Sequence, residues 1–404
     1  MFIAGESSGD LHGGHLASCL TKLRPDLTLF GLGGRSMKEV GVEILADPTQ
    51  VAVIGIVEVL RHLSTFRELF HQAVRALDER RPDLVVLIDY PGFNLRFAEE
   101  VKRRGIRLVY FISPQIWAWD PGRIHKIKRL VNRMLVVFPF EKSLYEKAGV
   151  PVTFVGHPLL ELVKPTLSRM EALERFALED ALPIIGLLPG SRRMEVKRIL
   201  PVMLAAGEKM QETLPSSARF LLIKAPHLPW ELYKEALDRS SLKPKVVERW
   251  DYDSIYTCDL VFVASGTATL ECALLDRPML ILYKTSWPTY LLSRLLIRIP
   301  MIGLVNVVAA FCSTSPSPNT SSSPDTSSSL TMSSSRKRGS FIVPEFVQHR
   351  ATPARIAQAG LEIWGSAEKR EAMRSDFRAL RESLGEPGAS IRAAQAILAE
   401  LPVR

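Results

Sequence analysis

The chain alternates short apolar runs with stretches in which apolar and charged residues follow a helical period. Four runs in its first part predict buried strands, at Leu84–Ile88, Leu108–Ile112, Met134–Phe138 and Val152–Val155. They are apolar at consecutive positions and rich in β-branched residues, which is typical of parallel strands covered on both faces. The segment Asn94–Arg104 between two of them has the pattern of a covering helix.

The second part of the chain repeats this order. Residues 194–213 predict an amphipathic helix, because five apolar side chains fall on one of its faces: Val196, Ile199, Leu200, Met203 and Leu204. Further buried strands are predicted at Ile184–Leu188, Phe220–Ile223, Lys245–Glu248, Leu260–Ala264 and Met279–Tyr283.

Strands that alternate with helices predict an α/β fold of βαβ units in doubly wound parallel sheets. The polar stretch Glu161–Pro183 separates two such series. We therefore expect two Rossmann-like domains, residues 1–164 and 165–404, facing one another across a cleft, because ligands of open α/β sheets bind beyond the carboxyl ends of the strands. Residues 313–340 are rich in serine, threonine and proline, and we expect a disordered insertion in the second domain.

The composition fits two α/β domains and limits the chemical classes of partner that the protein is expected to bind. A length of 404 residues suits two domains, and 47% hydrophobic content excludes a disordered chain. The four cysteines lie far apart, so neither a disulfide framework nor a C-x-x-C site is expected. No apolar run is long enough to cross a bilayer, and Glu6 and Asp10 interrupt the apolar start, so we expect a cytoplasmic protein. The net charge of +9 either aids solubility or serves an anionic partner, which could be nucleic acid, a phosphorylated substrate or a membrane surface.

Two strand-to-helix turns have the residues of a phosphate site. Gly190 permits close approach of the backbone, and Ser191 and Arg192 add a hydroxyl and a guanidinium beside the amides of a helix start. The second turn has the same order, with Ser265, Gly266 and Thr267 followed by Glu271, whose carboxylate suits a ribose diol. The residues of the two turns together are the expected nucleotide site of the second domain. Alone, the first turn is equally explained as a capped helix, and a motif like the second is more often one. Two such turns in one domain favour a nucleotide site.

A loop near the start of the chain predicts contacts to hydroxyl groups. The segment Ala4–Asp10 has two glycines and two carboxylates, and carboxylates repel phosphate, so Glu6, Ser8 and Gly9 are expected to meet a sugar or an acceptor. The glycine turn Gly31–Arg35 lacks the G-x-G-x-x-G spacing, so a nicotinamide enzyme is disfavoured.

Asp89 closes the apolar strand Leu84–Ile88, where an unused charge would cost desolvation. It is a candidate general base that takes a proton from an attacking hydroxyl, and the alternative is a helix cap or an ion pair with Arg96 or Arg123.

No metal site is expected. The D-x-D pair Asp251 and Asp253 resembles the metal ligands of sugar-nucleotide transferases, but it precedes a short helix, so capping is the favoured interpretation. The eight histidines are scattered. Two segments, Val57–Leu77 and Ser286–Leu304, mix leucine, aromatic residues and arginine; they suit either helices in a lipid headgroup layer or core helices with arginines that reach solvent.

Taken in order, eight motifs resemble the lipid-A-disaccharide synthase family, inverting glycosyltransferases of the GT-B type. They cover nearly the whole chain except 311–341, at Ala4–Asp10, Val53–Val59, Ile88–Asn94, Ser113–Trp119, Phe138–Glu141, Val155–Pro158, Leu188–Arg192 and Ala264–Glu271.

The resemblance implies that UDP-2,3-diacylglucosamine donates its sugar to the 6-hydroxyl of 2,3-diacylglucosamine 1-phosphate, with Asp89 as base and no cofactor. It implies that the two turns bind UDP, that Glu271 holds the ribose and that Asn306 joins the same site. It also implies peripheral attachment to the inner face of the inner membrane, a possible homo-oligomer and no nucleic acid.

Other interpretations stay open. A different GT-B protein, such as a UDP-N-acetylglucosamine transferase or epimerase, would share the turns but not Ile88–Asn94 and Ser113–Trp119. Because residues 311–341 replace a short turn of the family, a catalytically impaired sugar-nucleotide-binding homologue is the alternative of a different class.

Overall fold

The chain folds into two compact α/β units. Unit 1 comprises Met1–Glu161 and Leu384–Arg404, and unit 2 comprises Leu162–Ser383. The computed structural model describes residues 1–51, 63–179, 183–214, 218–249, 251–296, 301–312 and 341–402. The motif Val53–Val59 and the serine-rich segment 313–340 therefore lie outside the described residues.

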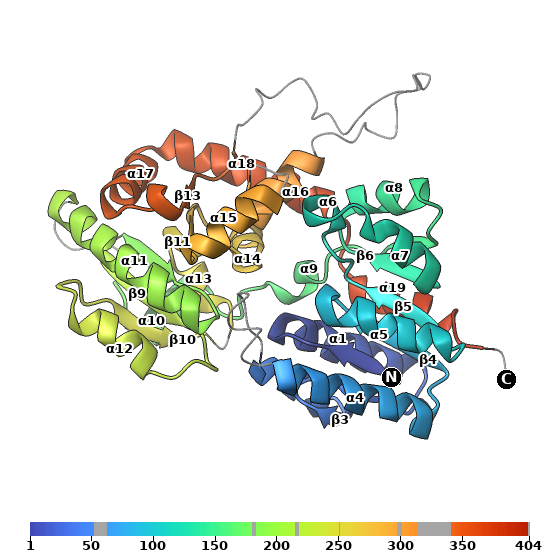
Figure 1. Ribbon diagram of the computed structural model, residues 1–404. Coiled ribbons are helices and arrows are strands. Elements are labelled where there is room, and N and C mark those ends of the chain that lie inside the picture. Colours follow the sequence, from blue (N-terminus) through green and yellow to red (C-terminus); the bar gives the residue numbers. More distant parts are fainter. Residues whose placement is uncertain are drawn as a thin grey trace, which may run out of the picture. The chain divides into compact units, whose positions relative to one another are not determined.

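Unit 1 is built on a seven-stranded, wholly parallel sheet with the strand order β3-β2-β1-β4-β5-β6-β7 (Figure 1). The pairings β1 with β4, β4 with β5 and β5 with β6 place three consecutive strand ends side by side. The strands are β1 (Phe2–Ala4), β2 (Phe30–Leu32), β3 (Glu43–Ala46), β4 (Leu84–Ile88), β5 (Arg107–Phe111), β6 (Arg133–Val136) and β7 (Val152–Phe154).

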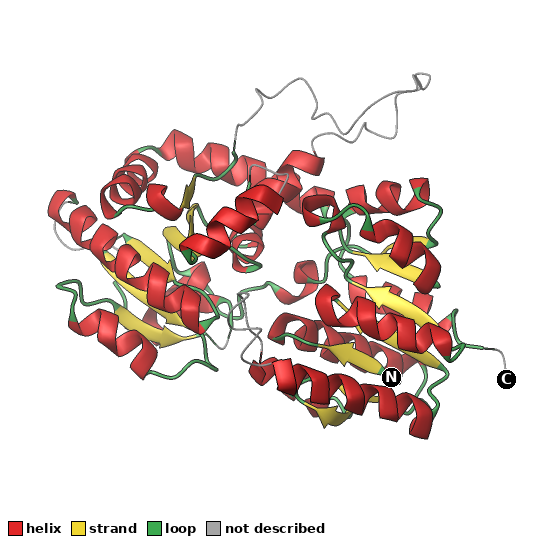
Figure 2. Ribbon diagram, viewed as in Figure 1, coloured by secondary structure: helices red, strands yellow, loops and turns green. Residues whose placement is uncertain are grey.

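The helices of unit 1 connect these strands and flank the sheet (Figure 2). They are α1 (Ser7–Leu23), α2 (Arg35–Glu39), α4 (Leu63–Arg80), α5 (Pro91–Arg103), α6 (Ile116–Trp119), α7 (Arg123–Leu130), α8 (Pro139–Lys147) and α19 (Ala389–Leu398), with the turn η1 (Pro48–Val51) and the short α9 (Leu159–Leu162) at the unit boundary. Pro91 and Pro139 each stand in the first turn of their helix, where a missing N–H costs no hydrogen bond.

Unit 2 has a six-stranded parallel sheet with the order β10-β9-β8-β11-β12-β13. Its strands are β8 (Ile184–Leu188), β9 (Arg219–Lys224), β10 (Lys245–Glu248), β11 (Leu260–Ala264), β12 (Met279–Tyr283) and β13 (Glu345–Val347). Its helices are α10 (Arg169–Arg175), α11 (Arg193–Thr213), α12 (Glu231–Asp238), α13 (Asp253–Tyr256), α14 (Ala268–Leu274), α15 (Trp287–Leu296), α16 (Leu304–Cys312), α17 (Pro353–Gly365) and α18 (Ala367–Ser383), with the turn η2 (Gln348–Arg350).

The predicted doubly wound α/β architecture is confirmed, because the strand order in each sheet reverses beside the first strand of its unit. Each of the nine predicted strands is present within two residues at either end, and the predicted apolar face of α11 is buried. Of the four other strands, β1 coincides with the apolar start of the chain, and β2, β3 and β13 were not predicted, because runs of three or four residues carry too little pattern.

The end of the chain differs from the expected domain division. Residues 165–404 were expected to form the second domain, but 384–404 belong to unit 1. The buried face of α19, with Ala389, Ala393 and Ile397, packs against α1. Glu400 then forms ion pairs with Arg107 at 2.9 Å and Arg133 at 2.6 Å. The apolar face of α19 predicts that the helix packs against a sheet. It does not predict which of the two sheets the helix covers, because the order of elements along the chain leaves both open.

Among the described residues, no helix has both the length and the apolar character needed to span a bilayer.

Candidate functional site

Asp89 lies at the carboxyl edge of the unit 1 sheet, immediately after β4. Its φ of 47° is in the left-handed region, and its amide donates to the Phe111 carbonyl at 3.1 Å. Its own carbonyl accepts from Asn94 Nδ2 at 2.7 Å and from the Tyr110 hydroxyl at 2.5 Å. Left-handed backbone at a residue other than glycine is costly and persists where the surroundings hold it, often at functional sites. The carboxylate is half-buried on a backbone fixed by three hydrogen bonds.

The loop with Glu6, Ser8 and Gly9 lies beside Asp89, because β1 pairs with β4 and Ala4 stands opposite Ile88. The two loops touch: a Cβ on Gly5 would lie 2.0 Å from Cδ1 of the Tyr90 ring, so glycine is required there. Burial, aided by the nearby Glu6 carboxylate, raises the pKa of Tyr90 to about 12. The structure thus brings these predicted residues together with Asp89.

Asp10, the second carboxylate of this loop, has a structural role. It accepts hydrogen bonds from the backbone amides of Gly34 at 2.7 Å, Ser36 at 2.8 Å and Met37 at 3.2 Å. These bonds satisfy the first amides of α2, where a negative charge is favourable.

In unit 2 the turn after β8 forms a small nest of N–H groups. Gly190 has a φ of 113°, which only glycine adopts readily. The amides of Ser191 and Arg192 point at the Glu195 carboxylate, at 3.2 and 3.3 Å, and the Arg192 guanidinium reaches it at 3.0 Å. The predicted turn therefore binds an anion in this structure, and that anion is a side chain of its own helix. Glu195 was not predicted, although a glutamate at the third position of a helix is a common partner of N-terminal amides.

The second predicted turn follows β11, which pairs with β8, so the two turns are neighbours at the same sheet edge. Ser265 Oγ donates to the Ile302 carbonyl at 2.9 Å, and the Thr269 hydroxyl donates to the Gly266 carbonyl at 2.8 Å. The Thr267 side chain does not cap α14. A Cβ on Gly266 would contact nothing within 4 Å, so the turn has open space at this glycine.

Glu271 is buried and paired with a cation that was not predicted. Its Oε2 lies 2.6 Å from Arg249 Nη2, and the Arg249 guanidinium stands 5.3 Å from the centre of the Tyr252 ring. Arg249 comes directly after β10, so charged residues that follow predicted strands are the signal that could have found it. A partner for the carboxylate is already present, and its expected contact to a ribose stays a prediction.

Asn306 is buried, and its amide is engaged by the protein. Its Nδ2 donates to the Val343 carbonyl and to Glu345 Oε1, both at 2.8 Å, and its Oδ1 accepts from the Val343 amide at 3.0 Å. Glu345 also accepts from the amides of Ile302 at 2.9 Å and Gly303 at 2.8 Å. Both N–H groups of Asn306 are therefore in use, so a direct bond from them to a ligand would require exchange.

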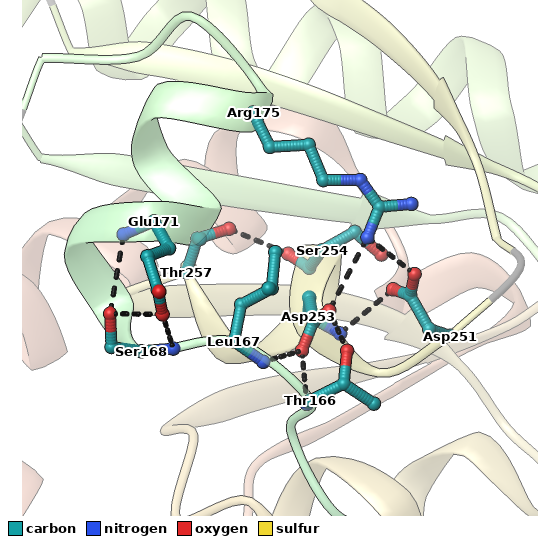
Figure 3. A network of polar contacts seen from close by, with 9 residues as sticks. All are labelled: Thr166, Leu167, Ser168, Glu171, Arg175, Asp251, Asp253, Ser254 and Thr257. Atoms are coloured by element: carbon teal, nitrogen blue, oxygen red, sulfur yellow. Dashed lines mark hydrogen bonds and ion pairs between the residues drawn. The ribbon is translucent and has the colours of Figure 1, made fainter.

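The D-x-D carboxylates hold a turn together and join it to the residues before α10 (Figure 3). The predicted capping role is met only in part, because Asp251 accepts from the first amide of α13, whereas the N-cap residue Tyr252 makes no side-chain cap. Asp253 accepts from the Thr166 amide at 2.6 Å, its hydroxyl at 2.5 Å and the Leu167 amide at 3.2 Å. Asp251 accepts from the Asp253 amide at 3.0 Å, and Arg175 contacts both carboxylates. Within the described parts of the chain, no group of three or more His, Cys, Asp or Glu residues is placed to hold a metal ion.

Solved structures with this architecture include sugar-nucleotide enzymes. The UDP-GlcNAc 2-epimerase from Neisseria meningitidis, bound to UDP-GlcNAc, superposes with a TM-score of 0.59 at 12% identity, over 96% of this chain and 97% of that one. The calicheamicin glycosyltransferase CalG4 gives a TM-score of 0.56 at 13% identity, over 99% and 96%. At this identity the likeness shows the fold alone, which is the GT-B type.

Relatives in sequence show the family as well as the fold. Lipid-A-disaccharide synthases are 40% identical over 395 residues in Syntrophus aciditrophicus, covering 98% of this chain and 95% of the relative, and 36% identical over 402 residues in Myxococcus xanthus, covering 100% and 97%. The sequence model described as lipid-A-disaccharide synthetase matches residues 1–315. The chain therefore belongs to the lipid-A-disaccharide synthase family, glycosyltransferases of lipid A biosynthesis.

Proposed function

We propose that the protein joins UDP-2,3-diacylglucosamine to 2,3-diacylglucosamine 1-phosphate, releasing UDP and a β-1,6-linked disaccharide 1-phosphate. The observation that carries the proposal is the Asp89 carboxylate at the end of β4, fixed on a left-handed backbone beside the Glu6–Gly9 loop. Family membership supplies the class of reaction, and the two turns of unit 2 supply groups suited to the donor's diphosphate.

Asp89 acts as the general base. It takes the proton of the acceptor's 6-hydroxyl as that oxygen attacks the anomeric carbon of the donor sugar. The bond from the anomeric carbon to the diphosphate breaks on the opposite face, so a single displacement inverts the configuration and UDP leaves with the electron pair. Glu6 and Ser8, on the neighbouring loop, bind hydroxyl groups of the acceptor.

The turns of unit 2 stabilise the departing UDP. The amides of Ser191 and Arg192 and the Arg192 guanidinium already converge on a carboxylate, so they are arranged for an anion before the donor arrives. Ser265, Gly266 and Thr267 add the neighbouring turn. Donors fixed in advance toward developing negative charge lower the barrier to leaving-group departure. Glu271, oriented by Arg249, is the group that meets the ribose.

Contact with the inner face of the inner membrane is part of this proposal, because both substrates are acylated. Helix α15 exposes Trp287 at 63% and Leu291 at 64%, and Trp287 packs edge-on against Tyr290 at 5.8 Å between ring centres. Exposed tryptophan and leucine on one helix suit the headgroup layer of a lipid surface.

The test is product formation by the purified chain. Donor and acceptor are presented in mixed micelles, and release of UDP and formation of the disaccharide are followed together. We expect both products in equal amounts. Absence of both, with protein whose thermal unfolding is cooperative, would overturn the proposal, and UDP release without disaccharide would indicate hydrolysis rather than transfer.

A further inference from the structure

A buried carboxyl group at the carboxyl edge of unit 1 has no role in the mechanism above. Glu141, in the first turn of α8, is 1% exposed. Its Oε1 accepts hydrogen bonds from Ser113 Oγ at 2.8 Å and from Trp117 Nε1 at 3.2 Å. Its Oε2 is buried without a hydrogen-bond partner among the described residues. An unsatisfied buried oxygen is costly, so a functional explanation is called for.

The topology places Glu141 near Asp89. The strands β4, β5 and β6 are neighbours, and the residues that follow them, Asp89, Ser113 and Glu141, lie along one sheet edge. The backbone joins these ends: the Asp89 amide donates to Phe111, and the Ile112 amide donates to Leu135 at 3.0 Å. The Asp89 charge also acts on the Glu141 carboxyl electrostatically.

Glu141 is a group that changes charge near neutral pH. Burial raises its pKa to about 7, and the Asp89 charge adds to this, while hydrogen bonds from Ser113, Trp117 and the Phe138 backbone oppose it. A second titratable group beside it is Tyr145, on the same helix, which donates to Ser113 Oγ at 3.3 Å. Burial raises the pKa of Tyr145 above its usual range, so Tyr145 stays neutral when Glu141 ionises.

We propose that Glu141 is a positioning residue for sugar transfer, which fixes the segment from Ser113 to Trp117 at the carboxyl edge and whose negative charge makes Asp89 a stronger base. The inference rests on the proposed role of Asp89. Two nearby carboxylates repel one another, and the proton that Asp89 takes from the acceptor hydroxyl relieves that repulsion. Ionised Glu141 therefore favours the proton transfer, whereas neutral Glu141 does not.

The variant Glu141→Gln separates the effect of Glu141 on the position of the Ser113–Trp117 segment from the effect of its negative charge on Asp89. Glutamine keeps an oxygen that accepts from Ser113 and Trp117, but it cannot ionise. We expect kcat within about twofold of the wild type below pH 7 and about tenfold lower above it, the size of a nearby charge interaction of one pKa unit. The matched control is Glu146→Gln, on the exposed face of the same helix, where the carboxylate pairs only loosely with Lys142 at 3.7 Å. That variant is expected to follow the wild-type profile.

A stability measurement shows whether the variant is folded. The folded-state pKa of Glu141 is raised above its usual 4.5, so wild-type stability falls as the pH rises from 4.5 to about 7, and Glu141→Gln is expected to unfold at or above the wild-type temperature beyond that range. Should Glu141→Gln fail to fold, Ser113→Ala serves instead. It removes a hydrogen bond that favours the ionised form, so the rise of kcat should move to higher pH.

Parallel kcat profiles for wild type and Glu141→Gln at every pH would overturn the inference, as would an unshifted profile in Ser113→Ala. The proposed function fails separately, if the wild type forms no disaccharide or if Asp89→Asn keeps near-normal turnover.

Discussion

The carboxyl edges of the two sheets share a topology but carry opposite chemistry. In unit 1 the segments that follow the strands carry the carboxylates of Asp89 and Glu141, and Glu141 accepts a hydrogen bond from Trp117 Nε1. In unit 2 they present glycines, hydroxyls and backbone N–H groups, as in the turns at Gly190 and Gly266. Carboxylates accept protons and hydroxyl hydrogen bonds, whereas N–H groups at a helix start bind anions. Substitutions in unit 1 should therefore change turnover, and those in unit 2 should change the affinity for UDP.

The substitution Asp89→Asn is expected to have the largest effect, and this effect should be on turnover rather than on UDP binding. Asparagine tolerates the left-handed backbone better than alanine does, so the local fold is retained while the base is lost. We expect kcat to fall about 10²- to 10⁴-fold, the usual effect of losing a general base. Calorimetric titration with UDP should give a Kd within about twofold of the wild type. Near-normal turnover would assign Asp89 a structural role. A large loss of UDP binding would contradict the assignment of turnover to unit 1 and of UDP affinity to unit 2.

The units should also differ in acid stability. In unit 1, burial lowers the pKa of His12 to about 4 and that of His157 to about 3, with the neighbouring histidines adding to it. The unit 2 histidines His227 and His349 are exposed. A folded-state pKa below the unfolded value of 6.5 means that the unfolded chain binds more protons, so stability is present above pH 6.5 and is lost toward pH 4.

His12→Gln tests this directly. A pKa lowered by about two to three units corresponds to about 3 kcal/mol, so denaturant titrations at neutral and at acidic pH should show that the variant loses less stability on acidification than the wild type by about this amount. The comparison between variant and wild type is needed because Glu141, with its raised pKa, contributes in the opposite direction over the same range. Equal losses in both proteins would contradict the assignment of His12 as a buried neutral group.

Gly190→Ala should act mainly on binding. A Cβ there would lie 2.4 Å from Glu195 Oε2 and 2.8 Å from Glu195 Cβ, on a backbone with a φ of 113°. We expect strain of about 1–3 kcal/mol and UDP affinity about tenfold weaker, measured by thermal unfolding and calorimetry. Gly41→Ala is the matched control, since Gly41 has a φ of 90° with nothing within 4 Å of the added atom. Equal affinity in Gly190→Ala and wild type would remove this turn from the UDP site.

The sequence was sufficient for the features that are local in the chain. The strand Leu84–Ile88 and the buried face of α11 follow from consecutive or periodic apolar residues, and the turn at Gly190 follows from a strand end beside a helix start. Partners that come from distant segments could not be predicted. Arg249 reaches Glu271 across 22 positions, and Asn306 binds Val343 across 37. Such pairs depend on how strands are ordered in the sheet, which hydrophobic patterning does not specify.

The smallest expected effect concerns Glu195, which shares its position in the first helical turn with Glu171 of α10. Glu171 closes a capping box with Ser168, through bonds of 2.7 and 2.8 Å. Glu195 likewise closes a capping box with its N-cap residue, Arg192, and it accepts in addition from the amide of Ser191; these are the two amides that the diphosphate is proposed to take.

Glu195→Gln should therefore bind UDP about threefold more tightly, because a competing negative charge is removed, while the loss of a favourable charge at the helix start costs about 0.3–1 kcal/mol of stability. Glu171→Gln should show a similar cost in stability with unchanged UDP affinity, measured by the same titration. If Glu195→Gln bound UDP more weakly, the carboxylate would be a scaffold of the turn rather than a stand-in for the ligand. The carboxyl edge of unit 2 would then need the Glu195 carboxylate to hold the N–H groups of its turn in place. Both sheet edges would carry functional carboxylates, and the two would differ in how these are arranged rather than in their charge.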